Sequence, residues 1–188
     1  MNDTKQYIPN SIDLQYISDY FQERVIKKDT KYHVLFSYID SKIRYSEDQA
    51  VTWVLYSDIK VIGGVKCQKA ATNLFGRRWI AYFAKEKYPQ AIGPYKFAGL
   101  PGLIMEIHDT RGDYHFTVSK IKKNTSSFTI NLDSYKNYPK NYYLKAKHNL
   151  EYEGAGFPDM TSELRRQYEE TAVVLKRMFN NPIELKPL

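Results

Sequence analysis

Apolar and polar residues alternate with a period of two over most of the central chain, a pattern typical of half-buried β-strands. The alternation is clearest from Tyr32 to Tyr38, where every second residue is apolar or aromatic. Comparable segments cover residues 43–45, 51–55, 65–71, 79–83, 103–109, 114–121 and 128–132. Gly63-Gly64 separates two of these segments and predicts a turn. We therefore expect a mainly antiparallel β fold.

Two further segments have apolar residues three and four positions apart, as in an amphipathic helix. The first covers residues 11–25 and the second residues 161–179. In the second, Thr161 or Ser162 is a candidate N-cap, and Asn181-Pro182 ends the pattern. The fold that these elements predict is mainly β: a twisted antiparallel sheet or half-open barrel with one or two packed helices, with an α+β arrangement as the alternative. We expect a single domain over residues 1–188.

The composition is that of a folded domain, with 43% hydrophobic and 26% charged residues in 188. No stretch approaches the ~18 consecutive apolar residues of a membrane-spanning helix. The chain starts MNDTKQYIPN, which lacks the pattern of a signal peptide. One cysteine, Cys67, cannot form an internal disulfide, and the four histidines do not have zinc-finger spacing.

The net charge of +7 comes from one segment of the chain. Residues 60–96 contain eight basic residues and a single acidic one, Glu86, whereas the remainder is neutral. If the strands of this segment pair, Lys66 and Arg78 could gather on one positive face that attracts phosphate groups of lipids. The alternative is that these side chains serve solubility. No recognition helix or aromatic RNA-binding motif is present, so we do not expect a nucleic-acid partner.

Residues 53–121 resemble the GLPGLI family, whose defining motif occurs here as Gly99-Leu100-Pro101-Gly102-Leu103-Ile104. The other similar segments are WVL at 53–55, KVIGGVKCQKA at 60–70, GRRWIAYF at 76–83 and GPYKF at 93–97. Val65 stands where the family usually has an aromatic residue, and the chain before Trp53 is short for the family. The resemblance implies a family core over about residues 50–123 and a small exported, periplasmic protein of the Gram-negative cell envelope without an established activity.

The motif itself permits two interpretations. Leu100-Pro101-Gly102-Leu103 predicts a type II turn, with proline at the second position and a positive φ at the glycine. Phe97, Leu100 and Leu103 would then form the apolar lip of a binding cavity. Alternatively, the turn is only a rigid device that folds an apolar loop over the sheet.

Cys67 also has two interpretations. Lys66 and Lys69 are close in sequence, and nearby cations lower the pKa of a thiol and make it reactive. However, Cys67 shares the strand face of Val65 and Ala71, which favours a buried packing residue.

A hairpin around Arg111-Gly112 brings together a candidate metal site. A two-residue turn there places Ile107 opposite Phe116, and on the other face it places His108 opposite His115, next to Glu106. Directly opposed residues lie about 4.5–5.5 Å apart, and two imidazoles with a carboxylate can bind zinc or copper. The alternative is an ordinary solvated sheet face.

No nucleophile elbow, phosphate-binding glycine loop or dinucleotide fingerprint occurs, so nothing in the sequence supports an enzyme, and no cofactor other than zinc or copper is indicated. The preferred function is a non-enzymatic binding or interaction module for an amphipathic or anionic ligand, lipid-like or a small molecule. Its ligand-binding residues would be Phe97, Leu100, Leu103, Lys66 and Arg78. The alternatives are an accessory subunit that binds a partner protein at the outer membrane, and a metal-binding protein or metal-dependent enzyme.

Overall fold

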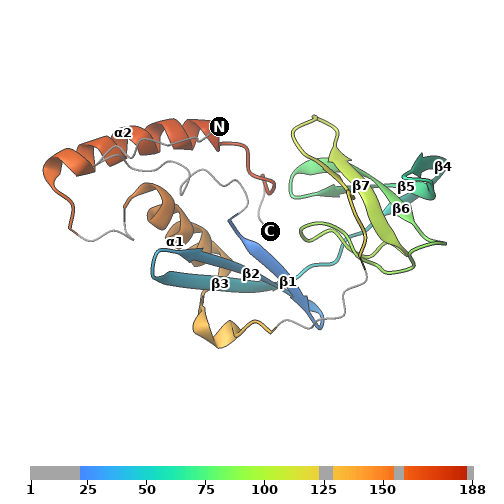
Figure 1. Cartoon of the computed structure of the whole chain (residues 1–188), viewed down its shortest axis with the longest axis horizontal. Coiled ribbons are helices and arrows are strands. Elements are labelled where there is room, and N and C mark those ends of the chain that lie inside the picture. Colours follow the sequence, from blue (N-terminus) through green and yellow to red (C-terminus); the bar gives the residue numbers. More distant parts are fainter. Residues whose placement is uncertain (1–21, 123–128, 155–158, 186–188) are drawn as a thin grey trace, which may run out of the picture. The chain divides into compact units, whose positions relative to one another are not determined.

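The computed structural model describes residues 22–122, 129–154 and 159–185 (Figure 1). Its internal contacts divide the chain into two compact units. The first contains residues 22–26, His33–Ser46 and the described part of Leu132–Asn180. The second contains Lys27–Tyr32 and the described parts of Glu47–Asn131 and Asn181–Leu188.

The first unit contains most of a four-stranded sheet with the order β1-β2-β3-β9. Its strands are β1 (Arg24–Lys28), β2 (Lys31–Tyr38), β3 (Ser41–Asp48) and β9 (Lys136–Asn137). The short β9 pairs in parallel with β3, with Ile43 opposite Lys136. The helical elements are η2 (Leu132–Ser134), α1 (Lys140–Tyr152) and α2 (Ser162–Met178).

Aromatic packing joins α1 to this sheet. The ring of Tyr143 in α1 lies 4.7 Å from that of Tyr45 in β3, and its hydroxyl donates to Glu23 Oε1 at 2.7 Å. The second helix is fixed to the first by the Tyr168 hydroxyl, which donates to the backbone carbonyl of Glu151 at 2.8 Å. The buried cluster comprises Val34, Phe36, Tyr38, Ile43, Tyr45, Tyr143 and Leu150.

The second unit is built on a five-stranded antiparallel sheet with the order β4-β5-β6-β7-β8, drawn from green to yellow in Figure 1. Its strands are β4 (Val54–Ile62), β5 (Val65–Leu74), β6 (Arg77–Ala84), β7 (Leu103–Asp109) and β8 (His115–Thr117). The register shifts between Leu55 and Ile59 and between Tyr82 and Phe83. Strands β4 and β8 are the edges of this sheet.

Both faces of the five-stranded sheet carry a buried apolar cluster, since the two sets of residues differ in parity on β5 and β6. On β7 the register shift opposite Tyr82 and Phe83 places Ile104 and Ile107 on one face. On one face, Ala70, Trp79, Ala81, Phe83, Ile104 and Ile107 pack with Phe97, Leu100, Tyr114 and Ile183. On the other face lie Val65, Cys67, Ala84 and Met105. A sheet covered on both faces explains why its strands do not alternate strictly between buried and exposed residues.

Two buried cations attach the segment after residue 180 to this sheet. Arg77 donates to Asp109 Oδ2 at 3.0 Å and to the backbone carbonyls of Pro182 and Ile183 at 2.9 and 3.2 Å. Lys96 pairs with Glu47 and with Glu184 Oε1, the latter at 2.5 Å. Both cationic side chains are fully buried, so their charges are balanced by these carboxylates rather than by water.

The mainly β prediction with packed helices is confirmed, and the strands are distributed over two sheets. The C-terminal helix is also confirmed, with the Thr161 side chain accepting from the Leu164 N–H as its cap. The strand predicted over residues 128–132 is wrong: residue 128 lies outside the described residues, 129–131 have no regular structure, and Leu132 begins η2.

The predicted N-terminal helix over residues 11–25 falls mostly outside the described residues. Its last two residues, Arg24 and Val25, belong to β1 and are not helical. Helix α1 was not predicted. None of the helices in the described part of the chain is long and apolar enough to cross a membrane.

Candidate functional site

The segment that approaches β7 is shaped by two glycines with different roles. Gly99 has φ +91°, a conformation that other residues rarely adopt. At Gly102 an added Cβ would lie 2.7 Å from the carbonyl carbon and oxygen of Ala84. The predicted positive φ at Gly102 is therefore wrong: Gly102 is not among the positive-φ glycines, and close packing against β6 is what requires a glycine there.

Most of the predicted apolar lip is buried in the core. Phe97 and Leu100 are each only 1% exposed and belong to the cluster around Trp79. The Trp53 indole N–H donates to the carbonyl of Ala98 at 2.8 Å and holds this loop in place. These two residues therefore act as the alternative interpretation expects, in a loop folded over the sheet.

Leu103, by contrast, is half-buried and lines an open groove of about 510 Å³. The groove runs between β7, β8 and the Gly93-Pro94 turn. Its apolar wall includes Leu103, Met105, Phe116 and Val118, and His115 and Thr117 provide polar groups. The sequence predicts that Phe116 lies opposite Ile107 on one strand face, but it does not predict a groove there, since nothing in the local pattern shows that β8 is an edge.

Lys66 and Arg78 do not gather on one face. Lys66 pairs with Val61 at one end of β5, and Arg78 pairs with Asn73 near the other end. Arg78 lies on the same face of the sheet as its partner Asn73. Lys66 and Asn73 are seven residues apart in β5, so their side chains point to opposite faces, and about 23 Å of strand separates them. A shared anion site for this pair is therefore not formed.

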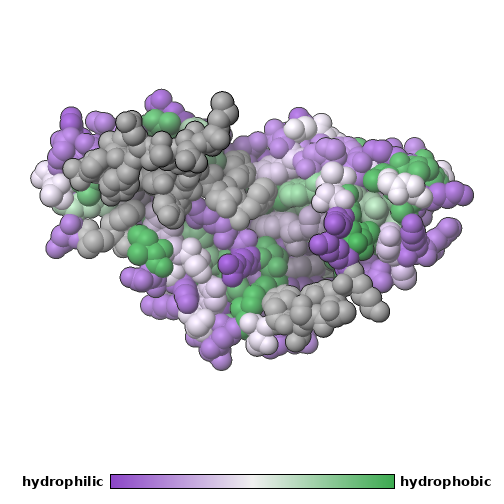
Figure 2. All heavy atoms as spheres, in the orientation of Figure 1, coloured by the Kyte–Doolittle hydropathy of each residue, from purple (hydrophilic) through white to green (hydrophobic). Residues whose placement is uncertain are grey.

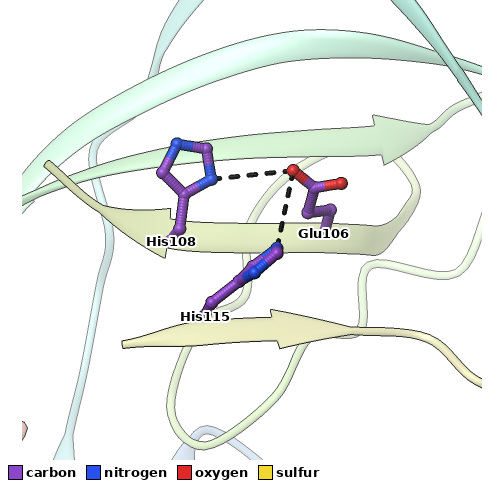
Figure 3. Close-up of side chains that lie close together, drawn as sticks. All are labelled: Glu106, His108 and His115. Carbon is purple, nitrogen blue, oxygen red and sulfur yellow. Dashed lines mark ion pairs between the residues drawn. The ribbon is translucent and has the colours of Figure 1, made fainter. Parts of the chain in front are cut away.

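The three candidate metal ligands do come together, on the hairpin of β7 and β8 (Figure 3). The predicted register is confirmed, with His108 opposite His115 and Glu106 opposite Thr117. Both imidazole rings point toward Glu106: His108 Nδ1 and His115 Nε2 each lie 3.7 Å from its Oε1. One ligand atom from each residue lies within 4.8 Å of the others.

Lys60 is a member of this cluster that sequence analysis missed. Its Nζ donates to both carboxylate oxygens of Glu106 at 2.8 Å and lies 4.9 Å from the ring centre of Tyr82. The Glu106 side chain is 10% exposed and that of Lys60 45%. The contact joins β4 to β7, which are not neighbours in the sheet, and contacts between such strands leave no signal in the local sequence.

Cys67 is a buried packing residue. Its side chain is inaccessible, and the Sγ lies 3.4 Å from the carbonyl oxygen of Val65. Burial raises the pKa of this thiol, and the nearby Glu106 carboxylate acts in the same direction. The neutral thiol is therefore favoured, in contrast to the thiolate that a nucleophile requires.

No family model matches the chain, and no curated protein matches it in sequence. Among solved structures, the fold is similar to that of PNGF-II, with a TM-score of 0.45 and 11% sequence identity. The matched region covers 65% of this chain and 24% of the PNGF-II chain, so this chain spans about a quarter of that protein's length. A likeness at this distance assigns neither a fold family nor an activity.

Proposed function

We propose that this protein is a non-enzymatic binding module whose groove along β7 and β8 holds an amphipathic small molecule with an anionic head group. The observation that carries the proposal is the groove itself, with its apolar wall and its polar residues His115 and Thr117. Its volume of about 510 Å³ falls within the range of about 300–1,000 Å³ that is usual for small-molecule sites. An acyl chain matches the apolar wall.

Exposed lysines near the groove favour an anionic head group. Lys85 and Lys87 lie in the turn after β6, whose backbone is hydrogen-bonded to the start of β7. Lys120 and Lys122, two and four residues after Val118, are also exposed. A carboxylate, sulfate or phosphate at the mouth of the groove would be attracted by these charges, more strongly at low ionic strength.

The cell-envelope location implied by the GLPGLI resemblance is a further part of this proposal. Gly102 packs closely against the backbone of Ala84, and Gly99 has a positive φ. Both glycines thus shape the chain that leads to Leu103, which gives the motif a structural role. On this proposal the motif positions one wall of the groove and does not contact the ligand through Phe97 or Leu100.

A second candidate function is binding of a partner protein along β4. This edge strand exposes four large apolar side chains, Val54, Leu55, Ile59 and Val61, at 51–64%. Figure 2 shows apolar side chains gathered at the end of the five-stranded sheet where β4 lies. Exposed apolar edge strands are templates for pairing with another chain.

The two candidates are separated by a pair of matched valine substitutions. Titration of the protein with the fluorescent acyl probe 11-(dansylamino)undecanoate measures occupancy of the groove. We expect Val118→Glu, in the groove wall, to weaken binding at least tenfold, whereas Val61→Glu, on the β4 edge, leaves it unchanged. Equal effects of both substitutions, or no saturable binding by the wild type, would contradict the groove proposal.

A further inference from the structure

We propose that Glu106, His108 and His115 form a site for a divalent transition metal ion, with Zn²⁺ as the favoured ion, and that Lys60 occupies the carboxylate of this site when metal is absent. This inference goes beyond the proposed function: His115 also lines the groove, but Glu106 and His108 do not, and the site does not require the groove to be occupied. Among the residues that the structure describes, these three form a cluster of the right types within 4.8 Å.

The donor set suits zinc and its spacing is close to that of a bound site. In a tetrahedral site with bonds of about 2.0–2.1 Å, neighbouring ligand atoms are about 3.4 Å apart. The two imidazole nitrogens are each 3.7 Å from Glu106 Oε1, and all three ligand atoms lie within 4.8 Å of one another, so side-chain rotations that draw the two imidazoles together would bring them to a common ion. Two imidazoles and one carboxylate leave a position open for water or another ligand, as in catalytic zinc sites.

The backbone holds the three ligands in register. His108 and His115 are paired across the two strands, and their ring centres are 5.7 Å apart. Glu106 lies two residues before His108 and therefore on the same face of β7. Each ligand thus comes from a hydrogen-bonded strand, and little rearrangement of the chain is needed for binding.

Lys60 competes with a metal ion for the Glu106 carboxylate. Its ammonium group already neutralises Glu106 through two contacts of 2.8 Å, and a metal ion must displace it from at least one oxygen. The Lys60 side chain is 45% exposed, so its charge can move into water at little cost. Removal of this competing cation should therefore tighten metal binding, whereas loss of either imidazole should weaken it.

The test is calorimetric titration of the metal-free protein with Zn²⁺, and with Mg²⁺ as a specificity control. We expect one zinc per chain and no magnesium binding, because Mg²⁺ prefers oxygen ligands. The double substitution of His108→Ala and His115→Ala should abolish zinc binding. His148→Ala, which removes an exposed histidine from α1, should leave it unchanged.

A second pair of variants tests the role of Lys60. Lys60→Met should bind zinc at least tenfold more tightly, whereas Lys66→Met, at an exposed position of the adjoining strand, should bind like the wild type. Circular dichroism establishes that each variant is folded. Absence of saturable zinc binding to the wild type, or equal zinc binding by the double-histidine variant, would overturn the site. Unchanged zinc affinity in Lys60→Met would overturn the proposed competition between Lys60 and the metal ion.

Discussion

Arg77 and Asp109 form an ion pair in which neither side chain is accessible to solvent, with Nη1 3.0 Å from Oδ2. The same guanidinium donates to two backbone carbonyls of the segment after residue 180, and its Cζ lies 4.9 Å from the ring centre of Tyr114. A single buried cation therefore joins β6, β7 and the C-terminal segment of the second unit. This arrangement positions the hairpin that carries the groove and the histidines.

Replacement of Arg77 by alanine should destabilise the protein by about 3–5 kcal/mol, because it leaves the Asp109 carboxylate buried and unpaired. Urea unfolding followed by tryptophan fluorescence measures this loss. Arg111→Ala is the matched control, since Arg111 is exposed on the same hairpin, and it should change stability by less than about 0.5 kcal/mol. Equal stability of the two variants would contradict the structural role of Arg77.

The contribution of Asp113 to stability should depend on pH. Its carboxylate accepts from Arg77 Nη1 at 2.6 Å, and this hydrogen bond lowers the pKa of Asp113 from its usual 3.8. A carboxyl group whose pKa is lower in the folded state stabilises the fold above its unfolded pKa, and this stabilisation is lost as pH falls through the folded value. The stability difference between wild type and Asp113→Asn should thus be constant near neutral pH and shrink below about pH 4. A difference that persists at pH 2 would contradict this assignment.

Gly102→Ala should destabilise the second unit by about 1–3 kcal/mol, since the new methyl group would press on the β6 backbone, which cannot move aside easily. Thermal unfolding measures the effect. Gly112→Asn is the control: it has a positive φ but no atom within 4 Å of an added Cβ, and asparagine tolerates this conformation. Gly112→Asn should destabilise the protein less than Gly102→Ala. The reverse order would mean that close packing at Gly102 does not determine the loss of stability.

Cys67 should be unreactive in the folded protein, because its side chain is fully buried and burial raises the pKa of the thiol. The rate of reaction with Ellman's reagent tests this, with Lys66→Cys in a Cys67→Ala background as an exposed reference. We expect the reference thiol to react at least a hundredfold faster, and wild-type Cys67 to react fully only in denaturant. Comparable rates would show that the thiol is accessible.

Local patterns were sufficient to predict the β7–β8 hairpin and α2. The period of two on either side of Arg111-Gly112 predicts which residues oppose each other, and the register of His108 with His115 follows directly. Thr161 and the apolar stripe behind it likewise predict a capped helix. Helix α1 has a weaker signal, because only Tyr143, Leu150 and Glu151 are buried in its 13 residues.

Contacts between segments that are far apart in the sequence could not be predicted. The pairing of Lys60 with Glu106 spans 46 residues, and that of Arg77 with Pro182 spans 105. Likewise, the position of Lys66 and Arg78 on opposite faces depends on the register of β5 with both of its neighbours. Proximity of these two cations in the sequence therefore did not place them on one face.

On the proposed function, the groove along β7 and β8 binds an amphipathic anion. This claim is tested most directly by mapping amide chemical-shift changes in ¹⁵N-labelled protein titrated with dodecanoate. We expect saturable changes at Leu103, Phe116 and Val118, with the β4 residues Ile59 and Val61 unaffected. Changes confined to β4, or none at millimolar dodecanoate, would contradict the claim.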